Sequence, residues 1–233
     1  MKNYIKEISV LGSENRKKAI EGILNSIGVN YQIVGNTTKN IVVSLNPTSN
    51  RLVIGAHYDA YYYGANDNAA ACVILLNLIN DLKNTNKSID FVFFDKEEDG
   101  GIGSIEYINI IGNNNIKGMI NLDMCGIGSN ILLTYDTINK SSFEFNCMED
   151  IISDPQVIVL HHLPFGDYNC FVYSGIPSIF IINSTDHNIA WFKGDTAFYP
   201  DFAKTMHTIN DTFDNISDKG MTMIYEFLKE KLI

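Results

Sequence analysis

Metal-binding types of side chain follow several apolar runs of this 233-residue sequence. The residues, each placed just after a run that reads as a strand or in the turn that follows one, are His57, Asp59, Asp67, Glu97, Glu98, Asp123 and His207. Two metal ions held by imidazoles and carboxylates a few Å apart can activate water for hydrolysis. Open α/β sheets place their sites at the carboxyl ends of strands, which is where these residues fall. The set therefore predicts a two-metal hydrolytic centre.

Each motif also has a purely structural interpretation. His57 and Asp59 could be a hydrogen-bonded pair, or Asp59 could fix the tautomer that leaves the other nitrogen of His57 free for a metal. Asp67 could cap a helix rather than bridge two cations. Glu97 and Glu98 could lie in a solvated acidic turn, or one could bind metal while the other takes a proton from water. Their joint occurrence in five separate loops favours the metal centre.

The spacing of apolar residues predicts the scaffold that brings these loops together. Helical periodicity marks residues 14–26 (with Ser13 as the cap), 69–82, 104–110, 142–152 and 217–231. A hairpin is predicted at residues 31–34 and 41–45. Strands buried on both faces are predicted at residues 52–56, 89–94, 118–122, 157–160 and 178–182. The alternation predicts a single domain over residues 1–233, a three-layer α/β/α sandwich with a central mixed, mostly parallel sheet and the hairpin at its antiparallel margin.

Composition narrows the function classes. The formal net charge of −10 disfavours nucleic acid, because phosphate binding needs clustered Lys and Arg. No apolar run approaches the roughly 20 residues that span a bilayer, and the first residues carry no secretory signal pattern, so we expect no membrane segment and a cytoplasmic location. The cysteines lack CxxC spacing and are expected to be buried thiols; they are Cys72, Cys125, Cys147 and Cys170.

Six short motifs occur in an order that carries a family resemblance. They are His57-Tyr58-Asp59, Gly64-Ala65-Asn66-Asp67-Asn68-Ala69, Glu97-Glu98-x-Gly, Asn121-Leu122-Asp123, Gly175-Ile176-Pro177 and His207-Thr208-x-x-Asp211-Thr212. With these motifs the chain resembles the catalytic domain of the M28 family of zinc peptidases, the co-catalytic di-zinc aminopeptidases. The resemblance implies the zinc-peptidase (phosphorylase/hydrolase-like) type of α/β/α fold.

The resemblance also implies a role for each site residue. His57 and Asp123 would hold one Zn²⁺, Glu98 and His207 a second, and Asp67 would bridge the two ions. Glu97 would be the general base that acts on a bridging water, and Asp59 would orient His57. Two cations would also relieve the repulsion among the crowded carboxylates. Co²⁺ or Mn²⁺ could substitute for zinc, because affinity order and availability both decide occupancy.

One position departs from the family pattern. Tyr168 stands where many members carry His, and its hydroxyl is either structural or a donor to the oxyanion of the transition state. Aromatic residues elsewhere are candidates for the walls or a lid of the pocket; they are Tyr61, Tyr62 and Tyr63, and within residues 186–202 Trp191, Phe192, Phe198 and Tyr199.

The predicted function is metal-dependent hydrolysis of peptide bonds by an aminopeptidase that releases N-terminal residues from short peptides. Two alternatives stay open. One is a glutaminyl cyclase-like acyltransferase that uses a single zinc, against which the complete two-metal ligand set argues. The other is a catalytically silent binding domain on the same scaffold, against which the presence of Glu97 and every ligand argues. The expected partner is a short peptide, with no nucleic acid or membrane, and the sequence leaves the oligomeric state open.

Overall fold

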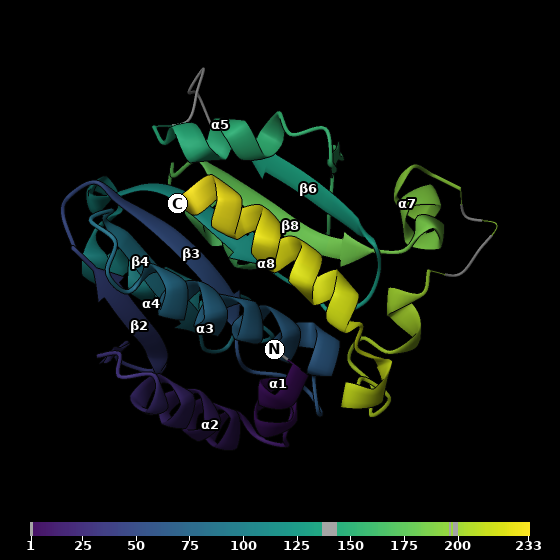
Figure 1. Cartoon of the computed structure of the whole chain (residues 1–233), viewed down its shortest axis with the longest axis horizontal. Helices are drawn as coiled ribbons and strands as arrows, with labels where there is room; N and C mark the ends of the chain where they lie inside the picture. The colour runs from purple at the N-terminus through teal and green to yellow at the C-terminus, as the bar shows by residue number, and fades with distance from the viewer. Residues whose placement is uncertain (1, 137–143, 196, 198–199) are drawn as a thin grey trace.

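A mixed sheet runs through the molecule (Figure 1). The computed structural model describes residues 2–136, 144–195, 197 and 200–233. The sheet has the order β1-β2-β4-β3-β5-β8-β6-β7. Its strands are β1 (Gln32–Val34), β2 (Asn40–Leu45), β3 (Arg51–His57), β4 (Ile89–Phe94), β5 (Ile116–Leu122), β6 (Asn130–Asp136), β7 (Val157–Val159) and β8 (Ser178–Ser184). The central strands β4, β3, β5 and β8 run parallel, while β1, β2 and β6 each pair antiparallel with a neighbour. The predicted mixed, mostly parallel sheet is confirmed.

Helices cover both faces of this sheet and complete the predicted three layers. One face packs against α1 (Lys2–Ile8), α2 (Ser13–Ser26), α3 (Ala70–Leu82), α5 (Asn146–Ile152) and α8 (Asp218–Leu232). The other face packs against α4 (Ile102–Ile111) and α6 (Asp167–Tyr173). Figure 1 shows α3 and α8 side by side in front of the sheet and α7 (Asp186–Phe192) beyond its end.

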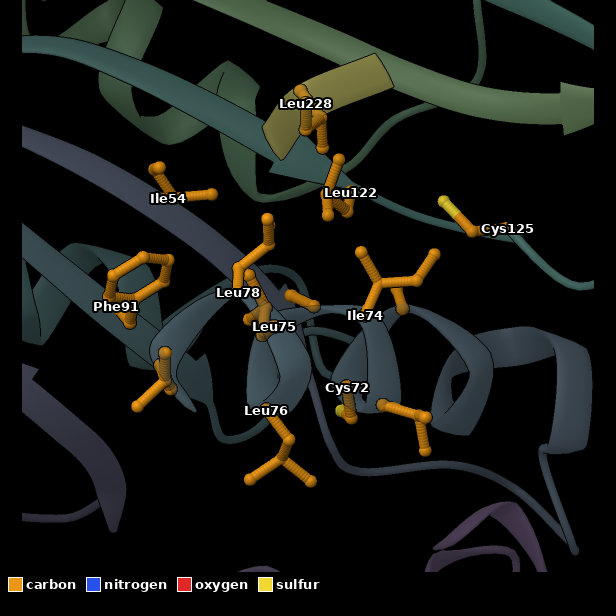
Figure 2. Close-up of a cluster of buried hydrophobic side chains, with 14 of the residues drawn as sticks. Ile54, Cys72, Ile74, Leu75, Leu76, Leu78, Phe91, Leu122, Cys125 and Leu228 are labelled. Carbon is orange, nitrogen blue, oxygen red and sulfur yellow. The ribbon is translucent and has the colours of Figure 1, made fainter. Parts of the chain in front are cut away.

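Helix α3 is apolar on nearly every side because it is enclosed by other elements. Ten of its 13 residues are buried, and they pack against β3, β4 and α8. Figure 2 shows Ile74 and Leu75 on the side of α3 that faces Leu122, whereas Cys72 and Leu76 lie on the opposite side. A helix fixed on several sides holds its first residue, Ala70, in place. The turn that carries Asp67 directly precedes that residue, so the core anchors the turn.

The structure differs from the predicted elements at one end of the sheet. The prediction that β7 is buried on both faces is wrong: β7 is an edge strand, and Val159 is 46% exposed. Its neighbour β6 was missed, although it pairs antiparallel with β8 along seven residues. Three helices of seven residues, α1, α6 and α7, were also missed, because two turns are too short for a 3.6-residue period to show.

The longer helices begin and end close to their predicted bounds. Ser217 caps α8 by accepting from the backbone N–H of Gly220 at 3.2 Å. Gly12 rather than Ser13 occupies the N-cap of α2. The predicted helix at residues 142–152 begins at Asn146, and residues 142–143 lie outside the described residues. Among the described helices, none is both long and apolar enough to span a bilayer.

Candidate metal centre

The metal-type side chains of the sequence converge at the carboxyl ends of the parallel strands. His57 ends β3, Glu97 and Glu98 follow β4, and Asp123 follows β5. Since β4, β3 and β5 are adjacent and parallel, their ends lie side by side. Asp67 enters from the turn before α3. His207 enters from the segment before α8, so five separate loops meet at one place.

Asp67 stands between two groups of ligand atoms. Its Oδ1 lies 3.1 Å from Nε2 of His57, which is 3.5 Å from Oδ1 of Asp123. Its Oδ2 lies 3.2 Å from Nε2 of His207, which is 3.0 Å from Oε2 of Glu98. Each group therefore combines one imidazole with one carboxylate of its own, and the two oxygens of Asp67 are divided between the groups.

These distances fit the geometry of zinc. Tetrahedral Zn²⁺ with bonds of about 2.0 to 2.1 Å separates neighbouring ligand atoms by about 3.4 Å. Buried oxygens without a hydrogen-bond partner also occur here among the described residues, namely Oε1 of Glu98 and Oδ1 of Asp123. A buried acceptor without a donor is costly unless a cation takes the donor's place. The residues present thus fit two zinc ions.

Glu97 lies beside the two groups but belongs to neither. Its Oε2 is 3.9 Å from Nε2 of His57, and the residue is 7% exposed. Burial raises the pKa of Glu97 to about 9, with the charges of Asp167 and Asp123 acting in the same direction and that of His57 opposing them. Without metal, the carboxyl group of Glu97 therefore keeps its proton at neutral pH.

The ionisable groups around Glu97 respond to the same crowding. Burial raises the pKa of Glu98 and of Asp123. Burial by itself would lower the pKa of His57, but the carboxylates of Asp123 and Glu97 raise it well above its ordinary value. Hydrogen bonds to Asp67 and Glu98 raise the pKa of His207 to about 10. Without metal the pocket therefore holds additional protons, as crowded carboxylates require.

These shifts predict how the stability of the metal-free protein depends on pH. Folded Glu97 keeps a proton that the unfolded chain releases above about pH 4.5, so its contribution to stability is lost as pH rises towards 9. The contribution of His207 is complete below pH 6.5 and is lost as pH rises towards 10. We therefore expect the unfolding temperature of chelator-treated protein to fall between pH 6.5 and 9. Zinc-loaded protein should not show this loss, because the ions replace the protons. Thermal unfolding at each pH measures the difference, and identical profiles would contradict the prediction.

Asp59 supports the centre in a way that differs from the expected one. The atom closest to Nδ1 of His57 is the backbone carbonyl oxygen of Asp59 at 3.1 Å, and the carboxylate oxygen Oδ1 is 3.5 Å away. The two carboxylate oxygens instead accept from the backbone N–H groups of Glu97 and Glu98, at 3.1 Å each. Asp59 therefore contacts His57 and also fixes the turn that presents the adjacent glutamates.

The turn that carries Asp67 is held by hydrogen bonds to Asp211, and Asp67 does not cap the helix that follows. Helix α3 begins at Ala70 with Ala69 as its N-cap, so Asp67 is not the cap of this helix. The carboxylate of Asp211 accepts from the backbone N–H of Asn66 at 2.8 Å and of Asp67 at 2.9 Å. Asp211 belongs to the motif His207-Thr208-x-x-Asp211-Thr212, and its spacing of four residues from His207 is the sequence signal for this contact.

Strained backbone coincides with the centre. Four residues other than glycine have positive φ among those described, and three of them are His207 itself, Lys96 before Glu97, and Met124 after Asp123. Residues other than glycine rarely adopt a positive φ, and such backbone strain is concentrated at functional sites. The conformation turns each loop sharply, which aims the neighbouring ligand into the pocket.

A cavity of about 300 Å³ opens above the two groups of ligand atoms. Its apolar lining comes from Met124, Pro164, Phe165 and Met206. Tyr61 also lines it, with its ring centroid 4.8 Å from that of His207, as the expected rim would require. Trp191 and Phe192 pack against Phe202 and do not line this cavity, while Phe198 and Tyr199 lie outside the described residues.

Tyr168 is not brought into the cavity. It is 8% exposed, and its ring stacks on that of Phe180 with centroids 4.8 Å apart. This position fits packing better than donation to an oxyanion.

We expect Tyr168→Phe to change turnover by less than about twofold, because removing the hydroxyl leaves the stacked ring. Steady-state kinetics would measure this, and a loss of about 10²-fold, as for an oxyanion donor, would contradict it.

Asp167 is a further buried acid near the centre. It is fully buried, and Oδ1 accepts from the hydroxyl of Ser104 at 2.6 Å, while Oδ2 has no hydrogen-bond partner among the described residues. Burial raises the pKa of Asp167 to about 7. Its charge adds to those that raise the pKa of Glu97. The position of Asp167 directly before Tyr168 is the sequence signal that points to it.

Comparisons with known proteins agree with this geometry. The family model described as "Peptidase family M28" matches residues 40–230. The "Vacuolar membrane protease" of Saccharomyces cerevisiae is 31% identical over 197 residues, which cover 79% of this chain. The chain spans only 18% of the length of that relative.

Two solved structures share the fold. A zinc aminopeptidase from Bacillus subtilis superposes with a TM-score of 0.66 at 22% identity, covering 83% of this chain and 49% of that one. The glutaminyl cyclase of Porphyromonas gingivalis superposes with a TM-score of 0.70 at 19% identity, covering 99% of this chain and 96% of that one. At these identities the two likenesses show the fold, and the chemistry must be argued from the site.

Proposed function

The chain belongs to peptidase family M28, and from this premise we propose that it is a zinc-dependent aminopeptidase. The observation that carries the proposal is the division of the two oxygens of Asp67 between two imidazole-carboxylate pairs. A single-metal enzyme needs only one such pair. Glu97, a buried carboxylate outside both pairs, is then available as the base.

The proposed ligand sets follow from the distances. His57 and Asp123 would hold one Zn²⁺, Glu98 and His207 the other, and Asp67 would bridge them. When bound, zinc would polarise the peptide carbonyl and lower the pKa of water to about 7. Asp59 would position His57 together with the glutamate turn.

Glu97 would move the proton. Its carboxylate would take a proton from the attacking water and give it to the nitrogen of the leaving amine as the peptide bond breaks. Glu97 belongs to neither group of ligand atoms, and two bound cations would favour its ionised form, so its carboxylate would be free to accept the proton.

The cavity supports a short peptide as the substrate. The wall formed by Met124, Phe165 and Met206 favours an apolar side chain at the N-terminal position. The volume of about 300 Å³ suits one residue and the adjoining peptide bond better than a folded protein.

The experiment combines metal analysis with two substrates. We expect two zinc ions per chain and amine release from leucine p-nitroanilide, with no release from its N-acetylated form. Cyclisation of a peptide with N-terminal glutamine at one zinc per chain would favour the cyclase function instead. Bound zinc without either activity would favour a silent binding domain. Organisation as a single domain over residues 1–233 and a cytoplasmic location stay predictions.

A further inference from the structure

A fully buried arginine contacts a loop of the metal centre from an element outside the family match. Arg16 belongs to α2, is 0% exposed, and precedes the residues 40–230 that the family model matches. It is on the same helical face as Ile20 and Ile23, where an apolar side chain would be expected. A buried guanidinium is costly unless its donors are satisfied and its charge is compensated. The burial of Arg16 therefore needs an explanation in terms of its contacts.

Each of the three guanidinium nitrogens of Arg16 donates a hydrogen bond to the same loop. Nε donates to the carbonyl oxygen of Tyr58, Nη1 to that of Tyr63 at 2.5 Å, and Nη2 to that of Gly64 at 3.3 Å. These carbonyls stand at the two ends of residues 58–64, which connect His57 to the turn of Asp67. The guanidinium thus joins the start of the loop to its end.

The loop joined in this way carries several parts of the centre. Asp59 lies near its start, and Tyr61, whose ring packs on His207, lies in its middle. The carbonyl oxygen of Gly64 also accepts from the backbone N–H of Ala69 at 2.9 Å, on the far side of Asp67. Displacement of Gly64 would therefore shift the turn that presents Asp67.

The charge of Arg16 also faces the centre. No carboxylate forms an ion pair with Arg16 within the part of the chain that the structure describes. Burial lowers its pKa, and the groups that counteract burial are Cys72 first, followed by Asp59, Asp67 and Asp211. Carboxylates of the centre therefore contribute to its compensation.

We propose that Arg16 is a positioning residue of the metal centre, whose three-carbonyl clamp on residues 58–64 sets Asp59 and Asp67 for metal binding. The inference rests on the two-zinc site of the proposed function. Removal of a group that holds the metal ligands in place by hydrogen bonds typically lowers metal affinity by about 10- to 100-fold. A residue needed only for stability would leave the affinity of the folded protein unchanged.

The test is zinc affinity of the full chain, measured by competition with a chromophoric chelator and normalised to the folded fraction. We expect Arg16→Met to raise the dissociation constant of at least one zinc by about tenfold or more. Arg51→Met is the matched control: it removes the ion pair of Arg51 with Asp90 (2.8 Å) at the opposite end of β3. We expect the control to lower the unfolding temperature and to leave the zinc dissociation constant within about twofold.

Arg16→Lys keeps the charge but cannot reach three carbonyls at once, so it should also weaken zinc binding. It replaces Arg16→Met if that variant does not fold. Unchanged zinc affinity in Arg16→Met, or wild-type affinity in Arg16→Lys, would overturn the clamp and leave the proposed function standing. Failure of the wild-type chain to bind zinc would overturn the proposed function and the clamp together.

Discussion

Replacement of Glu97 by glutamine is expected to lower turnover by about 10²- to 10⁴-fold, the range that a positioned general base contributes. The amide keeps the shape of the side chain but cannot take a proton from water. Zinc content should stay at the wild-type value, because Glu97 belongs to neither group of ligand atoms. Turnover of leucine p-nitroanilide and elemental analysis of the same preparation measure the two effects.

A matched control for this variant lies two residues further along the same turn. Asp99 is exposed and does not line the cavity above the metal centre, so Asp99→Asn makes the same acid-to-amide change without touching the centre. Turnover of the control should stay within about twofold of the wild type. A Glu97→Gln protein that hydrolyses peptides at the wild-type rate would contradict the assignment of the base. One that loses zinc would instead make Glu97 a ligand.

Replacement of Asp67 by alanine is expected to remove zinc and activity together. Both groups of ligand atoms would lose an oxygen, and the remaining pairs, His57 with Asp123 and His207 with Glu98, would have two protein ligands each. Catalytic zinc usually has three protein ligands, so we expect affinity to fall by more than about 100-fold at one site or both. Calorimetric titration with zinc and peptidase assays measure the losses.

Stability provides a second measurement for Asp67→Ala. A metal that binds only the folded chain raises the unfolding temperature, by an amount that depends on its affinity. Zinc should therefore raise the unfolding temperature of the wild type much more than that of Asp67→Ala. The exposed Asp214, close in sequence to His207, is the control, and Asp214→Ala should respond to zinc as the wild type does. An Asp67→Ala protein that binds two zincs with wild-type affinity would exclude the bridge.

The order of the elements and most of the ligand candidates could be predicted because both depend on short stretches of chain. The apolar run of residues 89–94 became β4 with the same bounds, and the end of each parallel strand placed its acid or imidazole at one edge of the sheet. Parallel strands must end on the same side when they are joined by crossover connections. The sequence therefore determined which residues would be near one another.

The tertiary structure alone decided which atoms of these neighbouring residues face one another. Which oxygen of Asp67 faces His57 and which faces His207 depends on segments about 140 residues apart meeting within 3.2 Å. The same holds for Arg16, which reaches carbonyls 42 to 48 residues away, and for β7, whose exposure depends on its place at the sheet edge. Local periodicity contains no information on such distances, because packing between elements sets them only after the elements have formed. The sequence by itself determined the ligand types and their strand ends, and the folded chain determined how the two oxygens of Asp67 are divided, that Glu97 lies outside both groups, and which carbonyls Arg16 contacts.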